Sequence, residues 1–398
     1  MFLAILAVAG TPTAASGMAQ VGPDRYLAGA PFFHSARHPD AQVAEIGELG
    51  GAIYLEADRF VFLDVSTQVL VFVNPATGTV ASAGGRGDGP QEFRSAGLLG
   101  RSGDGGVVVW DSEYRRVSVA DVIDGLGIVS DVRGHDRSLL LGGLGTRPVA
   151  RYGDGTLVVR TNAMPSGDPF QLVTREAGVF RDEHQYWLAV PGQERRLMFE
   201  AMASEKYSSA SGTATRATTS LIFGHLLLDA QAGQHFAVAQ TDLGVVRVFD
   251  RFGNVTSEIP LPAGVAVSDE QIEAERNRLL AANDGMADRV SRASTGDFDF
   301  GRLWGRRAEF IRTVPANSVA PPVDRMVGDL DGRLWLRVYR PGSESEYWQA
   351  WDLSGPSLMF TLTLSKGETF LDAAGDRVLL QTTDELDVEY VLVKEMTR

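Results

Sequence analysis

Short apolar runs separated by turns that contain Gly or Asp recur along this chain. In one unit the turn Gly103-Asp104-Gly105 precedes the apolar run Val107–Trp110, and a further strand-like run follows at Arg116–Ala120. Equivalent turns lie at Ala57-Asp58, Gly153-Asp154-Gly155, Ala232-Gly233, Asp331-Gly332 and Gly375-Asp376. Asp and Gly tolerate positive φ at small steric cost, so each turn predicts an antiparallel hairpin. The pattern indicates repeated copies of one structural unit.

A second polar turn closed by glycine follows most copies. Examples are Asn74–Gly78, Asp250–Gly253, Asp352–Gly355 and the segment VTREAG that ends at Gly178. Two turns in each unit predict four antiparallel strands. The second strands begin near Arg59, Gly106, Thr156, His235, Arg333 and Arg377. Most neighbouring starts are ~45–50 residues apart, the spacing of propeller blades, so we predict an all-β fold, a six-bladed β-propeller.

The last copy is incomplete, because only two strands are predicted after Gly375, at Arg377–Thr382 and Val388–Lys394. The segment Ala41–Leu49 stands before the first full copy. We expect it to pair with Val388–Lys394 as the closing strand of blade 6, since an unpaired strand edge favours aggregation. The propeller is then expected to span residues 41–398, after an N-terminal lead-in at residues 20–40.

Two longer gaps between copies predict insertions. Gly192–Ser220 becomes rich in Ser, Thr and Ala and predicts a long loop between blades 3 and 4. Residues 264–318 predict a helical, Arg-rich insertion between blades 4 and 5. Its helix starts at a capping box formed by Ser268 and Gln271. This helix is expected either to cover the propeller face or to serve as a lid or partner-binding element.

The acidic composition narrows the classes of partner. The chain of 398 residues has a formal net charge of −14 and no cysteine. Such a charge disfavours binding to nucleic acid or to an anionic membrane surface. Absence of cysteine excludes disulfides, thiolate nucleophiles and cysteine-ligated metals.

The N-terminal segment predicts export. Residues 1–19 combine the apolar run Phe2–Ala9 with small residues up to Ala19, which resembles a secretory signal peptide. No other segment approaches the ~20 apolar residues of a membrane span. We therefore expect a periplasmic or secreted protein with no membrane span.

The glycine-rich stretch Ala83–Gly97 is predicted to connect the outer strand of blade 1 to the inner strand of blade 2, with Phe93 packed between the blades. Its pattern comprises Gly85, Gly87, Gly89-Pro90 and Glu92-Phe93. Together with Asp331–Tyr339 and Thr382–Val393, it resembles the bacterial NHL-repeat-like six-bladed β-propeller proteins. The resemblance covers most of residues 40–396. It implies the fold and leaves the activity open, because such propellers include binding scaffolds and unrelated enzymes.

Other motif readings of the chain are weaker. The same stretch lacks the Gly-Lys-Ser/Thr of a phosphate-binding loop. The triplet Arg86-Gly87-Asp88 is interpreted as coincidence within the linker, and no Gly-x-Ser-x-Gly nucleophile motif occurs. The six histidines show no metal-binding spacing.

An arginine-rich segment in the second insertion is the candidate binding site. Its residues are Arg302, Trp304, Arg306, Arg307 and Arg312. Arginine offers paired donors to carboxylates and phosphates and stacks on aromatic rings. The segment therefore predicts recognition of an anionic group at a channel mouth, with pairing to nearby Asp and Glu as the structural alternative.

The leading functional hypothesis is an exported, non-catalytic scaffold that binds a protein, peptide or glycan through the propeller face or channel mouth, without a cofactor. The alternative is a metal-assisted lactonase- or lyase-type enzyme with its site at one end of the channel. Lactonase-type propellers place carboxylates in the channel. Glu56, Asp324 and Asp329 lie on or beside predicted first strands and are the candidate ligands of a divalent cation such as Ca²⁺.

Overall fold

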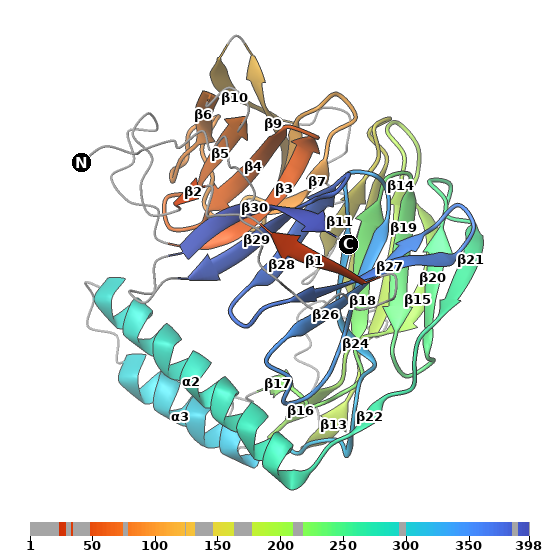
Figure 1. Ribbon diagram of the computed structural model, residues 1–398. Helices are drawn as coiled ribbons and strands as arrows, with labels where there is room; N and C mark the ends of the chain where they lie inside the picture. The colour runs from red at the N-terminus through yellow and green to blue at the C-terminus, as the bar shows by residue number, and fades with distance from the viewer. Residues whose placement is uncertain are drawn as a thin grey trace.

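The computed structural model describes residues 24–28, 33–34, 48–74, 79–123, 125–131, 146–162, 177–209, 218–293, 300–383 and 389–397. Four separate four-stranded sheets form blades 1 to 4, and one nine-stranded sheet contains blades 5 and 6, so the chain forms a six-bladed β-propeller, which confirms the predicted fold class (Figure 1). The predicted signal peptide lies outside the described residues. No helix in the described ranges has the length and apolarity to cross a membrane.

The strands of the first five blades follow one another in chain order, apart from an extra strand within blade 3. Blade 1 comprises β3 (Leu49–Glu56), β4 (Arg59–Asp64), β5 (Val69–Asn74) and β6 (Thr79–Gly84), and blade 2 comprises β7 (Ala96–Arg101), β8 (Val107–Asp111), β9 (Arg116–Ile123) and β10 (Leu126–Asp131). Blade 3 comprises β11 (Arg147–Arg151), β12 (Leu157–Asn162), β14 (Glu183–Ala189) and β15 (Arg196–Met202), and blade 4 comprises β18 (Leu227–Ala232), β19 (His235–Gln240), β20 (Val245–Phe249) and β21 (Val255–Pro260). Blade 5 comprises β24 (Val323–Gly328), β25 (Leu334–Val338), β26 (Glu346–Asp352) and β27 (Ser357–Leu364).

Blade 6 contains β28 (Thr369–Ala374), β29 (Arg377–Thr383) and β30 (Glu389–Thr397). Each first strand contacts the first strand of the next blade, and β28 contacts β3, so the ring is closed. All six predicted Gly/Asp turns join the first and second strands of a blade. The local turn chemistry thus predicted the repeat correctly.

Apolar side chains between neighbouring blades form the core. Each of the six blade–blade interfaces has its own buried cluster. Between blades 1 and 2, Phe93 is fully buried and packs with Phe72 and Val109. The predicted packing of Phe93 between blades is confirmed. Burial of such aromatic side chains supplies much of the cohesion between blades.

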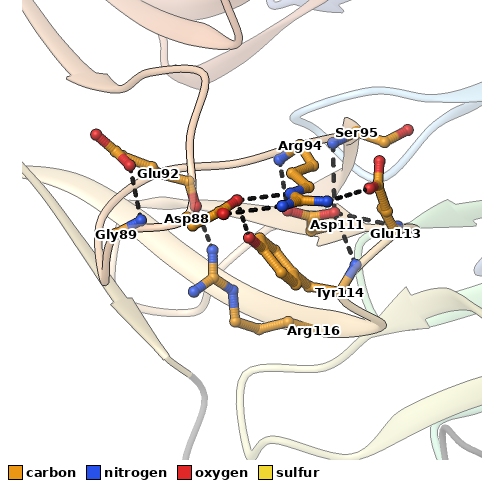
Figure 2. A network of polar contacts seen from close by, with 9 residues as sticks. All are labelled: Asp88, Gly89, Glu92, Arg94, Ser95, Asp111, Glu113, Tyr114 and Arg116. Carbon is orange, nitrogen blue, oxygen red and sulfur yellow. Dashed lines mark hydrogen bonds and ion pairs between the residues drawn. The ribbon is translucent and has the colours of Figure 1, made fainter.

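The linker between blades 1 and 2 is held by a polar network (Figure 2). Asp88 accepts hydrogen bonds from Arg94 at 2.6 and 2.8 Å and another from the hydroxyl of Tyr114. Buried Asp111 accepts from the backbone N–H groups of Arg94 and Ser95. These contacts commit the carboxylate of the Arg86-Gly87-Asp88 triplet to the fold, in agreement with its interpretation as a linker segment.

The closing strand differs from the prediction. The edge of β30 is occupied by β1 (Asp24–Ala28) and β2 (Phe33–His34), with Leu27 opposite Met396. β1 also pairs in parallel with β27 of blade 5. Leu49 instead begins β3 in blade 1, and residues 41–47 lie outside the described residues. Ala41–Leu49 is therefore not the strand seen on β30, because Leu49 is already paired with Asp64.

The region around the first insertion also differs from the prediction. Gly192–Ser220 was expected to be a loop, yet it contains β15, the fourth strand of blade 3. It also contributes β16 (Lys206–Ser208) and β17 (Thr218–Ser220), which form a small sheet with β13 (Gly178–Phe180). Gly178 consequently begins an extra strand and does not close a blade turn.

The second insertion is helical and lies between blades 4 and 5, as predicted, but it holds two helices where one was expected. α2 (Asp269–Ala293) and α3 (Phe300–Thr313) pack against each other at the side of the propeller (Figure 1). Ser268 and Gln271 exchange the two hydrogen bonds of a capping box, at 2.9 and 3.3 Å. At the base of the insertion, β22 (Val265–Ala266) pairs with β23 (Val319–Ala320).

Contacts with the blade 3–4 connection anchor the helical pair. Phe310 of α3 is buried with Leu221, Ile222 and Phe223, and its ring stacks on Tyr207 with centroids 5.8 Å apart. Arg276 of α2 donates to three carbonyl oxygens at the end of α3, which satisfies acceptors that a helix end leaves free. The helices are thus fixed relative to the blades.

Candidate functional site

A cavity of about 830 Å³ lies between the helical pair and the propeller. Its propeller wall includes Leu226, Asp324 and Thr369, which stand where the first strands of blades 4, 5 and 6 begin. Leu279 of α2 and Arg307 of α3 line the opposite side. We call this cavity the hairpin pocket. The lining residues place it at the end of blades 4, 5 and 6 where the first strands start.

An ion-pair cluster forms part of the blade-5 wall of the hairpin pocket. The guanidinium of Arg337 donates to both carboxylate oxygens of Asp324, at 2.6 and 2.7 Å, and to Glu346 at 2.5 Å. Glu346 also accepts from the indole N–H of Trp348 at 2.9 Å. Desolvation opposes the charge of Arg337, but its two carboxylate partners raise its pKa. Asp324 and Glu346 are therefore committed to Arg337.

The other carboxylates of the pocket are also paired with cations. Glu275 of α2 accepts from Arg278 at 2.6 and 2.8 Å, and this contact raises the pKa of Arg278. Glu344 pairs with Lys366 at 2.7 Å, and this contact lowers the pKa of Glu344. Glu368 pairs with Lys394. Each carboxylate that lines the hairpin pocket thus has a Lys or Arg partner.

Two arginines of the pocket remain without a carboxylate partner among the described residues. Arg307 lies over the ring of Trp304, 5.3 Å from its centroid, and Arg340 lies over Tyr347 at 4.2 Å. Both are exposed. Stacking on an aromatic face orients a guanidinium without using its N–H donors. The pocket therefore presents two oriented cations whose donors are available to a ligand.

The residues of the predicted arginine-rich segment lie in different places relative to the hairpin pocket. Arg307 lines the hairpin pocket and Trp304 lies beneath it. Arg306 and Arg312 are exposed on α3, and the structure does not place them on the pocket wall. Arg302 lies within α3, but its side chain is outside the described ones. Recognition of an anion by this segment thus stays a prediction, carried by Arg307.

The three predicted metal ligands do not form one cluster. Glu56 is more than half exposed and pairs with Arg59, while Asp324 pairs with Arg337. Asp329 is buried and accepts from Arg333 and from the indole of Trp335 at 2.8 Å. Within the described ranges, no group of three or more His, Asp or Glu side chains is arranged to hold a metal ion. Each of these carboxylates pairs with a nearby arginine, and a role as metal ligands stays a prediction.

Sequence reasoning missed Arg340. It lies between β25 and β26, beside Pro341 and Gly342, and the amide of Gln271 donates to the carbonyl of Pro341 at 2.9 Å. The pocket-forming loop is therefore tied to α2 by a contact between residues 70 positions apart. No local pattern reveals such a contact, although the turn signal of Pro341-Gly342 marks the loop itself.

No family model and no curated protein matches this sequence. Among solved structures, a calcium-binding regucalcin from Agrobacterium tumefaciens is 10% identical over 95% of this chain and 98% of its own, with a TM-score of 0.40. A putative exported protein from Bacteroides fragilis is 10% identical over 94% and 95%, with a TM-score of 0.45. A luciferin-regenerating enzyme is 13% identical over 93% of this chain and 96% of its own, with a TM-score of 0.37. At such identities the likeness concerns the fold alone, and the resemblance to NHL-repeat-like proteins stays a prediction.

Proposed function

We propose that this protein is an exported, non-catalytic binding scaffold that holds an acidic peptide segment of a partner in the hairpin pocket. The observation that carries the proposal is the pair Arg307 and Arg340, which line the pocket without a carboxylate partner among the described residues. Each guanidinium can donate two parallel hydrogen bonds to one carboxylate. Two such groups favour a ligand with at least two acidic side chains.

The surrounding charges support selectivity for an anion. The whole chain is acidic, with a net charge of −14. Its field is screened over roughly 8–10 Å at physiological salt, so the local arginines determine the potential in the pocket. The carboxylates in the wall are already neutralised by their Lys and Arg partners. An incoming acidic side chain therefore meets little local repulsion.

The same pairing favours binding over acid–base chemistry. A general base needs a carboxylate that readily takes up a proton. A carboxylate whose oxygens are held in an ion pair is not positioned to take a proton from a ligand. Asp324 and Glu346 share Arg337, and Glu275 is held by Arg278. These groups are better suited to shaping the wall of a binding pocket than to proton transfer.

The test measures binding of a fluorescent Glu-rich peptide by anisotropy. We expect the double variant Arg307→Gln/Arg340→Gln to weaken binding at least roughly tenfold, about 1.4 kcal/mol. Arg251→Gln is the matched control, because Arg251 also stacks on an aromatic ring, Phe252 at 4.7 Å, but lies outside the pocket. Binding by the wild type should weaken as salt rises.

Three results would argue against the proposal. One is equal affinity of the wild type and the double variant for the Glu-rich peptide. Another is equally tight binding of a Gln-rich peptide, which would show that charge is not recognised. The third is tighter binding of an acidic oligosaccharide such as oligogalacturonate, which would assign the pocket to a glycan.

A further inference from the structure

A second cavity, of about 540 Å³, lies in the central channel. It is lined by the first strands β3, β7, β11, β18 and β24, from five of the six blades. This volume falls within the range of roughly 300–1,000 Å³ typical of small-molecule sites. The channel cavity shares no lining residue with the hairpin pocket. It is therefore a separate candidate site.

Three charged residues of the channel cavity are already paired. Arg101 forms an ion pair with buried Asp372. Asp229 pairs with Arg160 and accepts from the hydroxyl of Tyr186 at 3.0 Å. Asp329 is held by Arg333 and Trp335, as described above. These groups form the wall and carry little uncompensated charge.

Two further charged residues that line the cavity, Arg147 and Arg151, have no carboxylate partner among the described residues. Desolvation, together with nearby Arg160, lowers the pKa of Arg147, and desolvation lowers that of Arg151. The Nε of Arg151 is buried and makes no hydrogen bond within the described part of the chain. A guanidinium keeps its charge at neutral pH. Asp229 acts on Arg147, and Asp104 and Asp154 act on Arg151, but among the described residues none of them forms an ion pair with these arginines. Arg147 is exposed and Arg151 is half-buried. A half-buried charge without a directly paired counter-ion is unfavourable, and an anion in the cavity would relieve this cost at Arg151.

The backbone that carries Arg151 is fixed from the neighbouring blade. The side-chain amide of Gln231 on β18 accepts from the N–H of Arg151 at 2.9 Å and donates to its carbonyl at 2.8 Å. This double contact links the first strands of blades 3 and 4. The backbone from which the guanidinium extends is thus held in place, which lowers the entropic cost of binding.

We propose that the channel cavity binds a small organic dicarboxylate, with one carboxylate on Arg147 and the other on Arg151. The two residues lie four positions apart on β11, or at most roughly 13 Å between backbone positions in an extended strand. Long side chains can reduce this separation between the guanidiniums. A flexible dicarboxylate of moderate length satisfies both charges, whereas a monocarboxylate satisfies only one.

Titration calorimetry with linear dicarboxylates from succinate to suberate, against hexanoate as the monocarboxylate, tests this site. We expect one chain length to bind best, and hexanoate to bind at least roughly tenfold more weakly. Arg147→Gln and Arg151→Gln should each remove this preference. Arg195→Gln is the matched control, since Arg195 stacks over Trp187 at 4.6 Å and does not line the cavity.

A second readout distinguishes a ligand site from a structural role. Without ligand, Arg147→Gln should leave the melting temperature unchanged or raise it, because it removes an unpaired charge. If Arg151→Gln fails to fold, Arg151→Lys keeps the charge and should retain weakened binding. No dicarboxylate binding by the wild type, or equal binding by wild type and Arg147→Gln, would overturn the proposal.

Discussion

The guanidinium of Arg101 on β7 and the carboxylate of Asp372 on β28 form an ion pair, although 271 positions separate them in the sequence. Arg101 also donates to the carbonyl of Tyr54 at 2.6 Å and to that of Gly328 at 3.4 Å. Asp372 in turn accepts from the N–H of Tyr54 at 2.6 Å. One arginine therefore joins four blades of the ring around the channel.

Loss of the Asp372 carboxylate should destabilise the propeller. Because Arg101 would keep its charge without a partner, we expect Asp372→Ala to lower the free energy of unfolding by about 3–5 kcal/mol. Urea unfolding followed by tryptophan fluorescence measures this change. The double variant Arg101→Met/Asp372→Leu removes both charges and should recover most of the loss. A double variant less stable than Asp372→Ala would contradict this account.

The stability of the protein should depend on pH through Asp372. Complete burial raises the pKa of this carboxyl to about 6, although the charge of Arg101 acts to lower it. The Oδ1 of Asp372 has no hydrogen-bond partner within the described residues. The unfolded value is about 3.9. The folded state thus holds the proton more tightly, so this contribution to stability is full below about pH 4 and is lost as pH rises through about 6.

The measurement compares the free energy of unfolding of the wild type with that of Asp372→Asn from pH 4 to pH 7. The Asn variant lacks this titration, so its stability relative to the wild type should increase with pH, by roughly 1–3 kcal/mol over this range. A difference that stays constant with pH would show that Asp372 remains ionised throughout.

Gly328 marks a close approach between the first strands of blades 4 and 5. A Cβ atom at this position would lie 1.8 Å from the carbonyl oxygen of Gln231. Gly328→Ala should force the strands apart and destabilise the fold by about 1–3 kcal/mol or more. Gly355→Ala is a suitable control, because no atom lies within 4 Å of its Cβ position. Equal thermal stability of both variants would contradict the prediction.

Removal of β1 and β2 should expose the edge of β30. Deletion of residues 1–34 is expected to cause aggregation, because an unprotected edge strand pairs with other chains. Deletion of residues 1–19 leaves both strands in place and should preserve a monodisperse protein. Size-exclusion chromatography with light scattering compares the two. A monodisperse 1–34 deletion with unchanged melting would show that these strands do not protect the edge.

The sequence predicted the parts of the fold that depend on local chemistry. Turns such as Gly103-Asp104-Gly105 and the capping box at Ser268 need only neighbouring residues, so their positions were predicted correctly. The partner of β30 depends on a long-range pairing, which the local sequence of Asp24–Ala28 does not reveal. The extra strand β13 was missed because it interrupts blade 3 between its second and third strands.

The candidate site was predictable to a smaller extent. The density of arginines pointed to the segment that contributes Arg307 to the hairpin pocket. The pairing of Asp324 with Arg337 follows from the β24–β25 register, where Arg325 lies opposite Arg337, but this register becomes clear only in the folded sheet. Asp324 was therefore interpreted as a free carboxylate, although the neighbouring strand already supplies its cation.

Pairing of β1 with β30 affects the order in which the chain can fold. Tyr26 lies opposite Thr397, so this contact spans nearly the whole sequence. During synthesis β1 leaves the ribosome early, whereas its partner strand is made only after the other five blades. Long-range pairing of this kind slows folding and prolongs exposure of strand edges. The pairing of β1 with β30 can thus form only after translation of β30, which leaves these strand edges of the nascent chain open to capture by chaperones.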